Sequence, residues 1–345
     1  MNTDRITDFC KKYISSKKSH CTSLGRFFET HSYPSPLPER GKGSKGVLLL
    51  CFLMSSYLLT GNFTPVRANT PPQMASAPIF TAQAQLGLPA AVQWLNQGLQ
   101  LIQQGNLGDA IAAFRQASQL DPDLAAAHYN LGLALRQQGE IQLAADAFYR
   151  ATQADPNFAL AFANLGAALL EGNNLQQAKD YLGRAVELNP NSGVAHYNLG
   201  LVMEKLGDLG NAIASFKKAI QFSPKAPEPV YHLGLMYLQQ NKIDDAQKAF
   251  EQAIKINSKY AESYYNLGAI YLNQGKLDAA LEAFRKSAEA NPNYANAYYA
   301  AGIVFLQQKN YSEAQRVLQY ARDLYTTQGN SEWATKVEEM LVRSP

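Results

Sequence analysis

Residues 261–294 read AESYYNLGAIYLNQGKLDAALEAFRKSAEANPNY, and this pattern decides the fold because the chain repeats it. One glycine of the pattern returns every 34 residues without a slip, at Gly98, Gly132, Gly166, Gly200, Gly234, Gly268 and Gly302. A fixed period of this length indicates one small unit that is stacked several times, rather than a single globular core.

Within the unit, two segments have the periodicity of a helix. When the recurring glycine is counted as position 8, positions 4, 7, 8 and 11 fall on one face of a first helix. Positions 20, 24 and 27 form the same kind of stripe on a second helix; they hold Ala, then Phe or Leu, then Ala or Ser. Because Gly at position 8 and Ala at position 20 lack bulk, we expect the two helices to approach each other closely there.

The ends of the helices are also marked in the sequence. Position 15 holds Gly105, Gly139, Asn173, Gly207, Asn241, Gly275 and Lys309. Gly and Asn tolerate the left-handed conformation that ends a helix, so a tight turn is expected there. Proline stands at position 32 in five of the seven copies and cannot continue the second helix. Each unit is therefore a helical hairpin, which buries its apolar faces only when it is stacked.

These residues closely resemble the tetratricopeptide repeat (TPR), which has a W-x2-L-G pattern followed by Ala, Phe, Ala and Pro. Trp94 occupies the tryptophan position of the first copy, although Gln97 replaces the leucine. The resemblance implies an all-α fold, a right-handed superhelical solenoid of seven hairpins. The copies are 91–124, 125–158, 159–192, 193–226, 227–260, 261–294 and 295–328.

The C-terminal end of the array departs from the pattern. Ala301, Leu318 and Thr326 replace Leu, Phe and Pro in the seventh copy, as suits a terminal repeat. Residues 329–345 then predict a capping helix that shields the last repeat. Ser331 is its candidate N-cap, and its apolar stripe consists of Trp333, Val337, Met340 and Leu341.

The first 90 residues differ in kind. Residues 1–67 carry ten Lys or Arg against four Asp or Glu, whereas residues 68–345 carry 21 against 24. Within the basic part, residues 47–59 form an apolar run that is shorter than the roughly 20 residues of a spanning helix. We divide this part into 1–68, a basic tail with a signal peptide or a signal anchor, and 69–90, a proline-rich linker.

Two explanations of the long basic tail stay open. Translation starts further in, near Arg40, or the whole segment is an anchor that tethers the chain to a membrane through 47–59. In both cases the positive flank stays inside, so the repeats are expected on the extracytoplasmic side. All three cysteines, Cys10, Cys21 and Cys51, precede the expected cleavage point after Ala68.

We find no signature of chemistry in the sequence. Phosphate-binding loops, metal-ligand spacings and nucleophile elbows are missing, so no enzyme activity, cofactor or metal is expected. His128 and His196 stand at position 4, where other copies have aromatic residues, and we interpret them as packing residues. The repeats have no basic stripe, which argues against nucleic acid as a partner.

Binding is therefore expected on the face of the first helices, which in the TPR family lines the concave groove. Positions 2, 5, 6, 9, 12 and 13 share a sector there. Position 6 holds Asn96, Asn130, Asn164, Asn198, His232 and Asn266, and the tyrosines of position 5 are Tyr129, Tyr197, Tyr231, Tyr265 and Tyr299. An asparagine amide has both a donor and an acceptor, which match the N–H and C=O groups of a peptide backbone.

The asparagine row is similar to the asparagine ladder in the TPR domain of the O-linked N-acetylglucosamine transferase, which grips substrate peptide. A packing interpretation, in which these residues simply accompany the repeat consensus, remains open. The absence of lysine at position 5 argues against the TPR clamp for acidic C-terminal tails.

The sequence thus predicts a non-catalytic scaffold for protein–protein interaction, with an extended polypeptide bound in the groove. One alternative is an assembly or secretion factor for a membrane complex that uses convex or terminal surfaces. Another is an accessory subunit of a separate glycosyltransferase.

Overall fold

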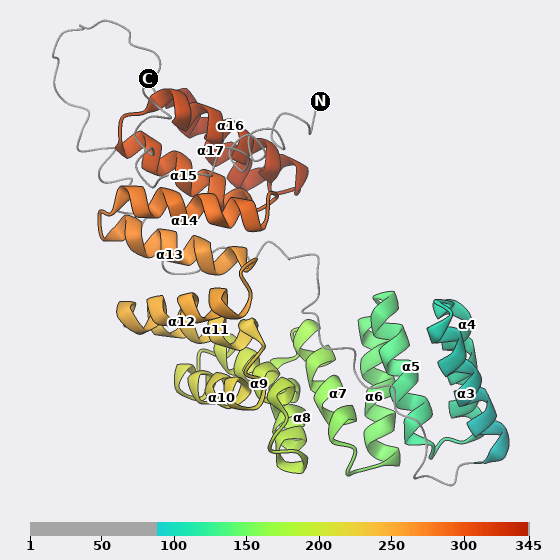
Figure 1. Ribbon diagram of the computed structural model, residues 1–345. Coiled ribbons are helices and arrows are strands. Elements are labelled where there is room, and N and C mark those ends of the chain that lie inside the picture. Colours follow the sequence, from blue (N-terminus) through green and yellow to red (C-terminus); the bar gives the residue numbers. More distant parts are fainter. Residues whose placement is uncertain (1–87, 344–345) are drawn as a thin grey trace, which may run out of the picture. The chain divides into compact units, whose positions relative to one another are not determined.

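The computed structural model describes residues 88–343, and every regular element in that range is an α-helix. The all-α class is therefore confirmed (Figure 1). The helices are α3 (Pro89–Gln103), α4 (Leu107–Leu120), α5 (Ala125–Gln138), α6 (Ile141–Ala154), α7 (Ala159–Glu171), α8 (Leu175–Leu188), α9 (Gly193–Lys205), α10 (Leu209–Phe222), α11 (Pro227–Gln239), α12 (Ile243–Ile256), α13 (Ala261–Asn273), α14 (Leu277–Ala290), α15 (Ala295–Gln307), α16 (Tyr311–Thr327) and α17 (Ser331–Arg343). The basic tail, its apolar run and nearly all of the linker lie outside the described residues.

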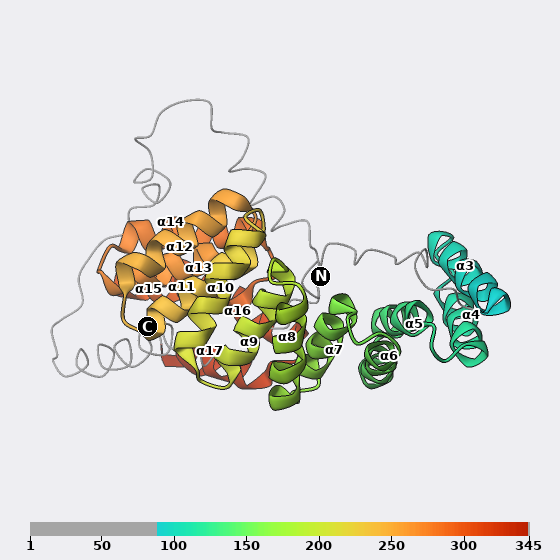
Figure 2. The ribbon, with the colours of Figure 1, turned by 90° about the horizontal axis from the view of Figure 1, so that it is seen from below.

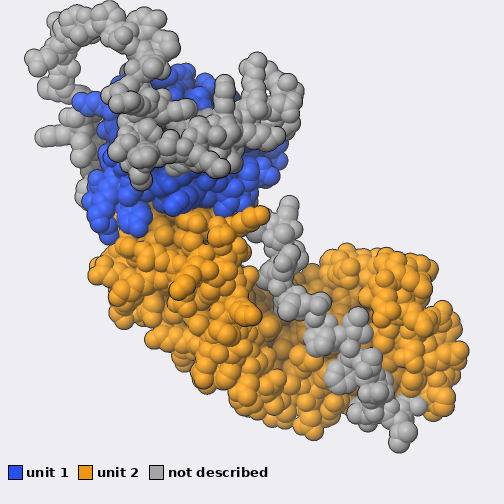
Figure 3. All heavy atoms as spheres, in the orientation of Figure 1, with its two compact units in different colours: residues 1–58, 271–345 blue, residues 59–270 orange. Residues whose placement is uncertain are grey.

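The described residues divide into two compact units, 88–270 and 271–343, which we call the N-terminal and C-terminal units (Figure 3). The N-terminal unit holds α3 to α12 and the first ten residues of α13. The C-terminal unit holds the rest of α13 and α14 to α17. Within 88–343, no helix is both long and apolar enough to span a bilayer.

Helices of the N-terminal unit pack as successive hairpins (Figures 1 and 2). Each first helix packs against the second helix that follows it, as α3 does against α4 and α5 against α6. Each second helix then packs against the first helix of the next hairpin, as α6 does against α7. In addition, α7 contacts α9 directly. In the C-terminal unit, α14 packs against α15, α15 against α16, and α16 against α17.

Gly at position 8 is required by the approach of the two helices within a hairpin. A Cβ atom added at Gly132 would lie 2.6 Å from the ring of Phe148, and one added at Gly166 would lie 2.5 Å from Leu182. Both distances are far below van der Waals contact, and Ala144 at position 20 of the Gly132 hairpin is fully buried. The expected close approach is confirmed.

The turns between the helices of a hairpin use the left-handed conformation at position 15, as expected. The glycines there have positive φ, and so do three larger residues: Asn173 (60°), Asn241 (57°) and Lys309 (59°). The residue after the turn donates its N–H back into the first helix, for example from Glu140 to the carbonyl oxygen of Leu135 at 2.9 Å. This bond satisfies a carbonyl that the end of the helix leaves open.

The second helices α4 to α14 end at an Asp, Asn or Ser, and the cap residues of α4, α6, α12 and α14 are in extended conformation. Where this residue is Asp or Asn, its side chain accepts a hydrogen bond from the backbone two residues later. Asp121 Oδ1 accepts from the N–H of Asp123 at 3.1 Å, and Asn291 Oδ1 from that of Asn293 at 3.0 Å. The Asp-Pro or Asn-Pro pair therefore stops the helix and shapes the link to the next hairpin.

A capping helix, α17, follows α16 as expected. Its Trp333 ring packs edge-on against Tyr299 at 5.5 Å and lies 6.0 Å from the ring of Tyr325. The N-cap assignment to Ser331 was wrong by one residue. Asn330 Oδ1 accepts from the N–H of Trp333 at 3.3 Å, so Asn330 is the cap and Ser331 is the first helical residue.

Candidate peptide-binding wall

Positions 5 and 6 of the first helices form one row in the N-terminal unit, which we call the Asn/Tyr row. Asn164 Nδ2 on α7 donates to the hydroxyl of Tyr129 on α5 at 3.3 Å. Asn266 Nδ2 on α13 makes the equivalent bond to Tyr231 on α11 at 3.4 Å. Each bond joins position 6 of one first helix to position 5 of the first helix before it.

His232 replaces asparagine where α9 and α11 meet. Its Nδ1 lies 2.9 Å from Oε2 of Glu204 on α9. Its ring contacts Tyr197 edge-on at 5.7 Å and Tyr231 at 5.4 Å. Since α7 also contacts α9, the Asn/Tyr row is continuous from α5 to α13 within the N-terminal unit.

Most asparagine side chains of the row donate their amide hydrogen bonds to groups within the protein. Asn130, Asn164 and Asn266 are 3%, 8% and 6% exposed. Their Nδ2 atoms donate to the carbonyl oxygens four residues earlier, at 2.8, 2.9 and 2.8 Å. A carbonyl oxygen only accepts, so the orientation of each amide is fixed. The predicted ladder offers both donors and acceptors to a peptide, whereas at these three positions the Nδ2 donor is used within the protein.

Asn198 on α9 differs from those three rungs. It is 5% exposed, and its Nδ2 has no hydrogen-bond partner among the described residues. Position 5 of the preceding first helix, α7, is Ala163, whereas Tyr129 and Tyr231 occupy that position before Asn164 and Asn266. No tyrosine hydroxyl is therefore available to Asn198. Asn96, the sixth residue of the set, is exposed on α3.

Of the five tyrosines, only Tyr197 and Tyr231 keep part of their surface exposed. Tyr129 is fully buried, with the ring of Phe158 at 4.9 Å. This burial raises the pKa of Tyr129 to about 12, against a smaller lowering by the bond from Asn164. Tyr265 and Tyr299 are also buried. Phe158, at position 34 of its repeat, covers Tyr129. Ala226 holds the same position in the repeat of Tyr197, and this small residue leaves Tyr197 partly exposed.

Four functional candidates on this wall are absent from the residues predicted from the sequence: Glu204, Glu228, Glu262 and Tyr260. Burial raises the pKa of Tyr197, and the carboxylates of Glu228 and Glu204 raise it further. Burial also raises the pKa of Tyr260, with contributions from Tyr231, Glu262, Tyr197 and Glu228. Glu228 and Glu262 stand at position 2 and Glu204 at position 12, both within the predicted binding sector, so the sequence pattern could have identified them. Tyr260 stands at position 34, outside that sector, and no sequence pattern pointed to it.

The two histidines at position 4 are packing residues, as predicted. His128 and His196 are 4% and 2% exposed. Each places Nε2 against the carbonyl oxygen of the proline that ends the previous hairpin, Pro122 at 2.9 Å and Pro190 at 2.8 Å. Burial lowers the pKa of both imidazoles. Within 88–343, no three His, Cys, Asp or Glu side chains gather as metal ligands would.

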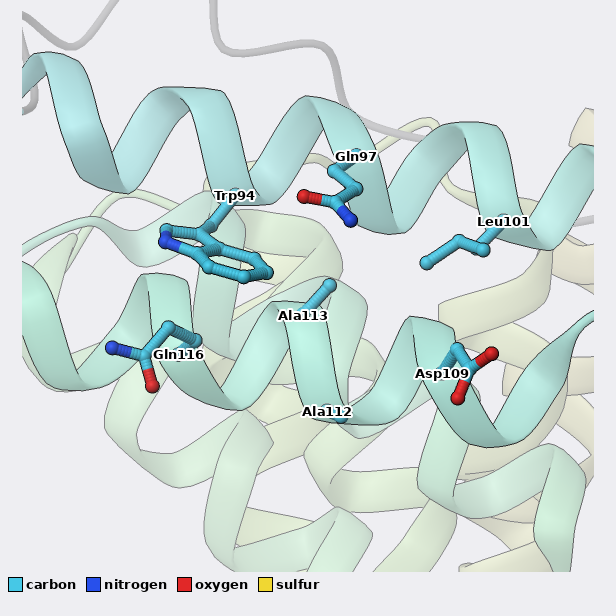
Figure 4. A pocket seen from close by; sticks show the side chains of 7 residues that line it. All are labelled: Trp94, Gln97, Leu101, Asp109, Ala112, Ala113 and Gln116. Atoms are coloured by element: carbon cyan, nitrogen blue, oxygen red, sulfur yellow. The ribbon is translucent and has the colours of Figure 1, made fainter.

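A separate hollow of about 360 Å³ lies on the first hairpin (Figure 4). Trp94, Gln97 and Leu101 line it from α3, and Asp109, Ala112, Ala113 and Gln116 line it from α4. Trp94 is 37% exposed, whereas His128 and His196 are buried at the same position of later hairpins. No hairpin precedes α3 in the described part of the chain.

Solved TPR structures share this fold. A tetratricopeptide repeat protein from Parabacteroides merdae matches with a TM-score of 0.58 and 19% identity, over 72% of this chain and 99% of the other. Pseudomonas aeruginosa pilF matches with a TM-score of 0.53 and 21% identity, over 60% of this chain and 95% of the other. The APC/C hetero-tetramer Cut9–Hcn1 matches with a TM-score of 0.56 and 19% identity, over 72% of this chain and 48% of the other. At these identities the likeness concerns the fold. A comparison with curated proteins gave no significant match.

Two family models match the chain. The model described as TPR repeat matches residues 98–139. The model described as the cilia and flagella-associated protein 70 C-terminal domain matches residues 125–340, which is well over half of the chain. Together with the glycine contacts, the left-handed turns and the stacked hairpins, these matches show that the chain is a tetratricopeptide-repeat protein and belongs to the family of the cilia and flagella-associated protein 70 C-terminal domain.

Proposed function

We propose that this protein is a non-catalytic scaffold that binds an extended polypeptide along the Asn/Tyr row of the N-terminal unit. The observation that carries the proposal is the continuity of that row from α5 to α13, documented by the contacts of Asn164, His232 and Asn266. Side chains that repeat along adjacent helices match a ligand that is itself periodic, and an extended peptide backbone is such a ligand.

Two features of the row support a peptide as the ligand. The Nδ2 of Asn198 is buried and unpartnered among the described residues, and a peptide carbonyl would satisfy it once the side chain turns toward the ligand. The partly exposed rings of Tyr197 and Tyr231 supply apolar area with few rotatable bonds. Each hydrogen bond contributes about 0.5–1.5 kcal/mol net, and ordering the peptide offsets much of that. Micromolar, permissive binding is therefore expected.

The proposal is tested by site-specific crosslinking. A photoreactive amino acid replaces Tyr197 or Tyr231 in the full chain, which is then irradiated with synthetic unstructured peptides of mixed composition. Tyr149, an exposed tyrosine on the second helix α6, is the matched control. Crosslinks from 197 and 231 but not from 149 are expected; equal yields from all three sites would contradict a site on the first helices.

A second measurement concerns the rungs themselves. Replacing Asn130, Asn164 and Asn198 together by Ala is expected to weaken peptide binding, as measured by fluorescence anisotropy, while the helical circular dichroism signal is kept. Asn198→Ala alone should account for much of the loss, since its donor is the one that the protein leaves unused. An unchanged affinity of the triple variant would rule out the asparagine ladder.

The hollow at Trp94 favours one further candidate, an assembly factor that uses the terminal surface of the array (Figure 4). An exposed indole beside a hollow of mixed polar and apolar lining is the kind of anchor point that interfaces use. Photoreactive residues are placed at position 97, in the hollow, and at position 197, on the Asn/Tyr row. Capture of the same partner from both positions would contradict the idea that the hollow binds a partner of its own.

We further propose that the repeats lie on the extracytoplasmic side of a membrane, by export or by a tether through 47–59. The basic residues before that apolar run support this orientation. N-terminal sequencing of the chain from its native cells distinguishes cleavage after Ala68 from retention of the segment. In a protease test, any outer barrier of the cells is opened while the membrane that bounds the cytoplasm stays closed. Repeats that remain protected from the added protease would contradict the proposed orientation.

A further inference from the structure

Three glutamates and three tyrosines gather on the same wall where α9, α11 and the beginning of α13 lie in succession. We call them the Tyr–Glu cluster: Tyr197, Tyr231, Tyr260, Glu204, Glu228 and Glu262. The Tyr231 and Tyr260 rings are 5.2 Å apart. His232 contacts Tyr197 and Tyr231 and pairs with Glu204. All six residues belong to the N-terminal unit.

The carboxylates of the cluster act on the same phenols. Glu204 and Glu228 both disfavour the ionised form of Tyr197, and Glu228 and Glu262 both disfavour that of Tyr260. Glu228 and Tyr231 stand at positions 2 and 5 of α11, one helical turn apart on one face, and the backbone carbonyl of Glu262 accepts from the same Asn266 amide that donates to Tyr231. The cluster combines rings from two successive repeats with acids from three successive first helices.

The negative charge of the cluster is not balanced by the protein. Among the described residues, Glu228 and Glu262 form no ion pair, and the only basic group paired with Glu204 is the imidazole of His232. The neighbouring part of the wall differs, since Arg136 on α5 pairs with Glu171 on α7. All three glutamates are partly buried, so a charge that approaches them is screened less than it would be in water. A cation from a ligand would supply the counter-charge that Glu228 and Glu262 lack among the described residues.

The tyrosine rings favour a cation carried by a side chain. Tyr197 and Tyr231 are partly exposed, and Ala226 leaves the first of them without the aromatic cover that Phe158 gives Tyr129. A guanidinium group stacks on aromatic faces and binds carboxylates through two parallel hydrogen bonds. An ammonium group is a compact, strongly hydrated charge that does not stack on aromatic rings as a planar guanidinium does.

We propose that the Tyr–Glu cluster selects a basic segment of the bound polypeptide, with an arginine side chain placed against Tyr197 and Tyr231 and paired with Glu228 and Glu262. This inference rests on the proposed function and names the class of peptide that the wall takes. The partner is then an extended chain with an arginine in the stretch that crosses α9, α11 and α13.

The test uses the full chain and four unstructured fluorescent peptides that differ only at one central residue: Arg, Lys, Gln or Glu. The Arg peptide is expected to bind at least about tenfold more tightly than the Gln peptide, with Lys between them and Glu weakest. A tenfold ratio corresponds to one well-formed charged contact at this depth of burial. Raising the salt concentration should reduce the ratio.

The variant Glu228→Gln/Glu262→Gln should lower the ratio of the affinity for the Arg peptide to that for the Gln peptide to near one. The matched control is Glu140→Gln/Glu251→Gln, which removes the same charge from exposed positions at α6 and on α12. The thermal midpoint of the first variant should equal that of the wild-type chain; this measurement distinguishes a loss of selectivity from unfolding.

The outcomes separate the two proposals. If no peptide binds the wild-type chain, the proposed function fails. If peptides bind but Arg gains nothing over Gln, the proposed function stands and this inference is overturned. It is also overturned if the Glu228→Gln/Glu262→Gln variant keeps the ratio, or if the control variant loses it equally, which would indicate an effect of net charge alone.

Discussion

At the scale of single residues, the recurring glycine and the phenylalanine or leucine opposite it set how closely the two helices of a hairpin pack. The contact leaves no room for one further methyl group, because a Cβ at Gly132 would lie 2.6 Å from the Phe148 ring, far below the van der Waals contact distance. Gly183, also within a helix, does not have that constraint. Around Gly183 in α8, a Cβ would meet nothing within 4 Å.

This difference predicts opposite effects for the same substitution. Gly132→Ala should destabilise the chain by about 1–3 kcal/mol, since the ring or the backbone must move. Gly183→Ala should stabilise it by about 0.4–1 kcal/mol, because Ala restricts the unfolded chain and favours the helix. Urea unfolding followed by circular dichroism measures both, and a destabilising Gly183→Ala would contradict the open space around that residue.

Side chains that look equivalent in the sequence differ in what they still offer to a ligand. Asn130, Asn164, Asn198 and Asn266 occupy one position of the repeat, yet Asn198 alone among them has an Nδ2 without a partner among the described residues. The bond to the carbonyl four residues earlier, which the other three asparagines make, is missing at Asn198. The repeat pattern alone does not reveal this difference, because all four positions hold the same residue.

At the scale of elements, α17 closes the C-terminal unit by covering rings that α15 and α16 would otherwise expose. Trp333 contacts Tyr299 and Tyr325, and Val337 is fully buried. The hydroxyl of Tyr325 in turn donates to Asn296 Oδ1 at 2.6 Å. The capping helix is therefore an integral part of the core of this unit.

Removing the indole tests that role. Trp333→Ala should destabilise the chain by roughly 3 kcal/mol, the low end for buried aromatic residues, because Trp333 remains partly exposed. Glu332→Ala is the control, since Glu332 is exposed and makes only a surface ion pair with Lys336. Differential scanning calorimetry compares the two; equal thermal midpoints would mean that the tyrosines need no cover from α17.

Much of each element could be predicted from the sequence because the signals are local. The 34-residue period, the left-handed turns and the helix-ending prolines act over a few residues of one hairpin. The N-cap of α17 was placed one residue late because Asn330 and Ser331 are both good capping residues, and the choice depends on the geometry of the preceding turn. The Tyr–Glu cluster was missed because Tyr260 stands outside the first helices and reaches the wall only through the stacking of repeats.

At the scale of the whole molecule, proton binding links the stability of the described fold to pH. Burial lowers the pKa of His128 and His196 below the ordinary histidine value of 6.5. Below that pH, the two histidines bind protons in the unfolded chain but remain largely neutral in the folded chain. The contribution of these two histidines to stability is therefore complete above pH 6.5 and is lost as the pH falls toward their lowered pKa values.

The expected result is a drop in the free energy of unfolding between about pH 7 and pH 5 that is smaller in the variant His128→Phe/His196→Phe. Phenylalanine is the residue that the chain itself places at this position in Phe162. Urea titrations at a series of pH values measure the slope for both proteins. Parallel curves would show that the buried histidines do not control the acid response.

The two tryptophans of this chain make its ends spectroscopically distinct. Trp94 lies in the first hairpin, 37% exposed, whereas Trp333 lies in the capping helix among tyrosines. Their emission spectra should differ in wavelength, and tyrosine emission near Trp333 should transfer to its indole. With each tryptophan replaced in turn by Phe, the intrinsic fluorescence of the chain reports separately on the melting of either end, without any added label.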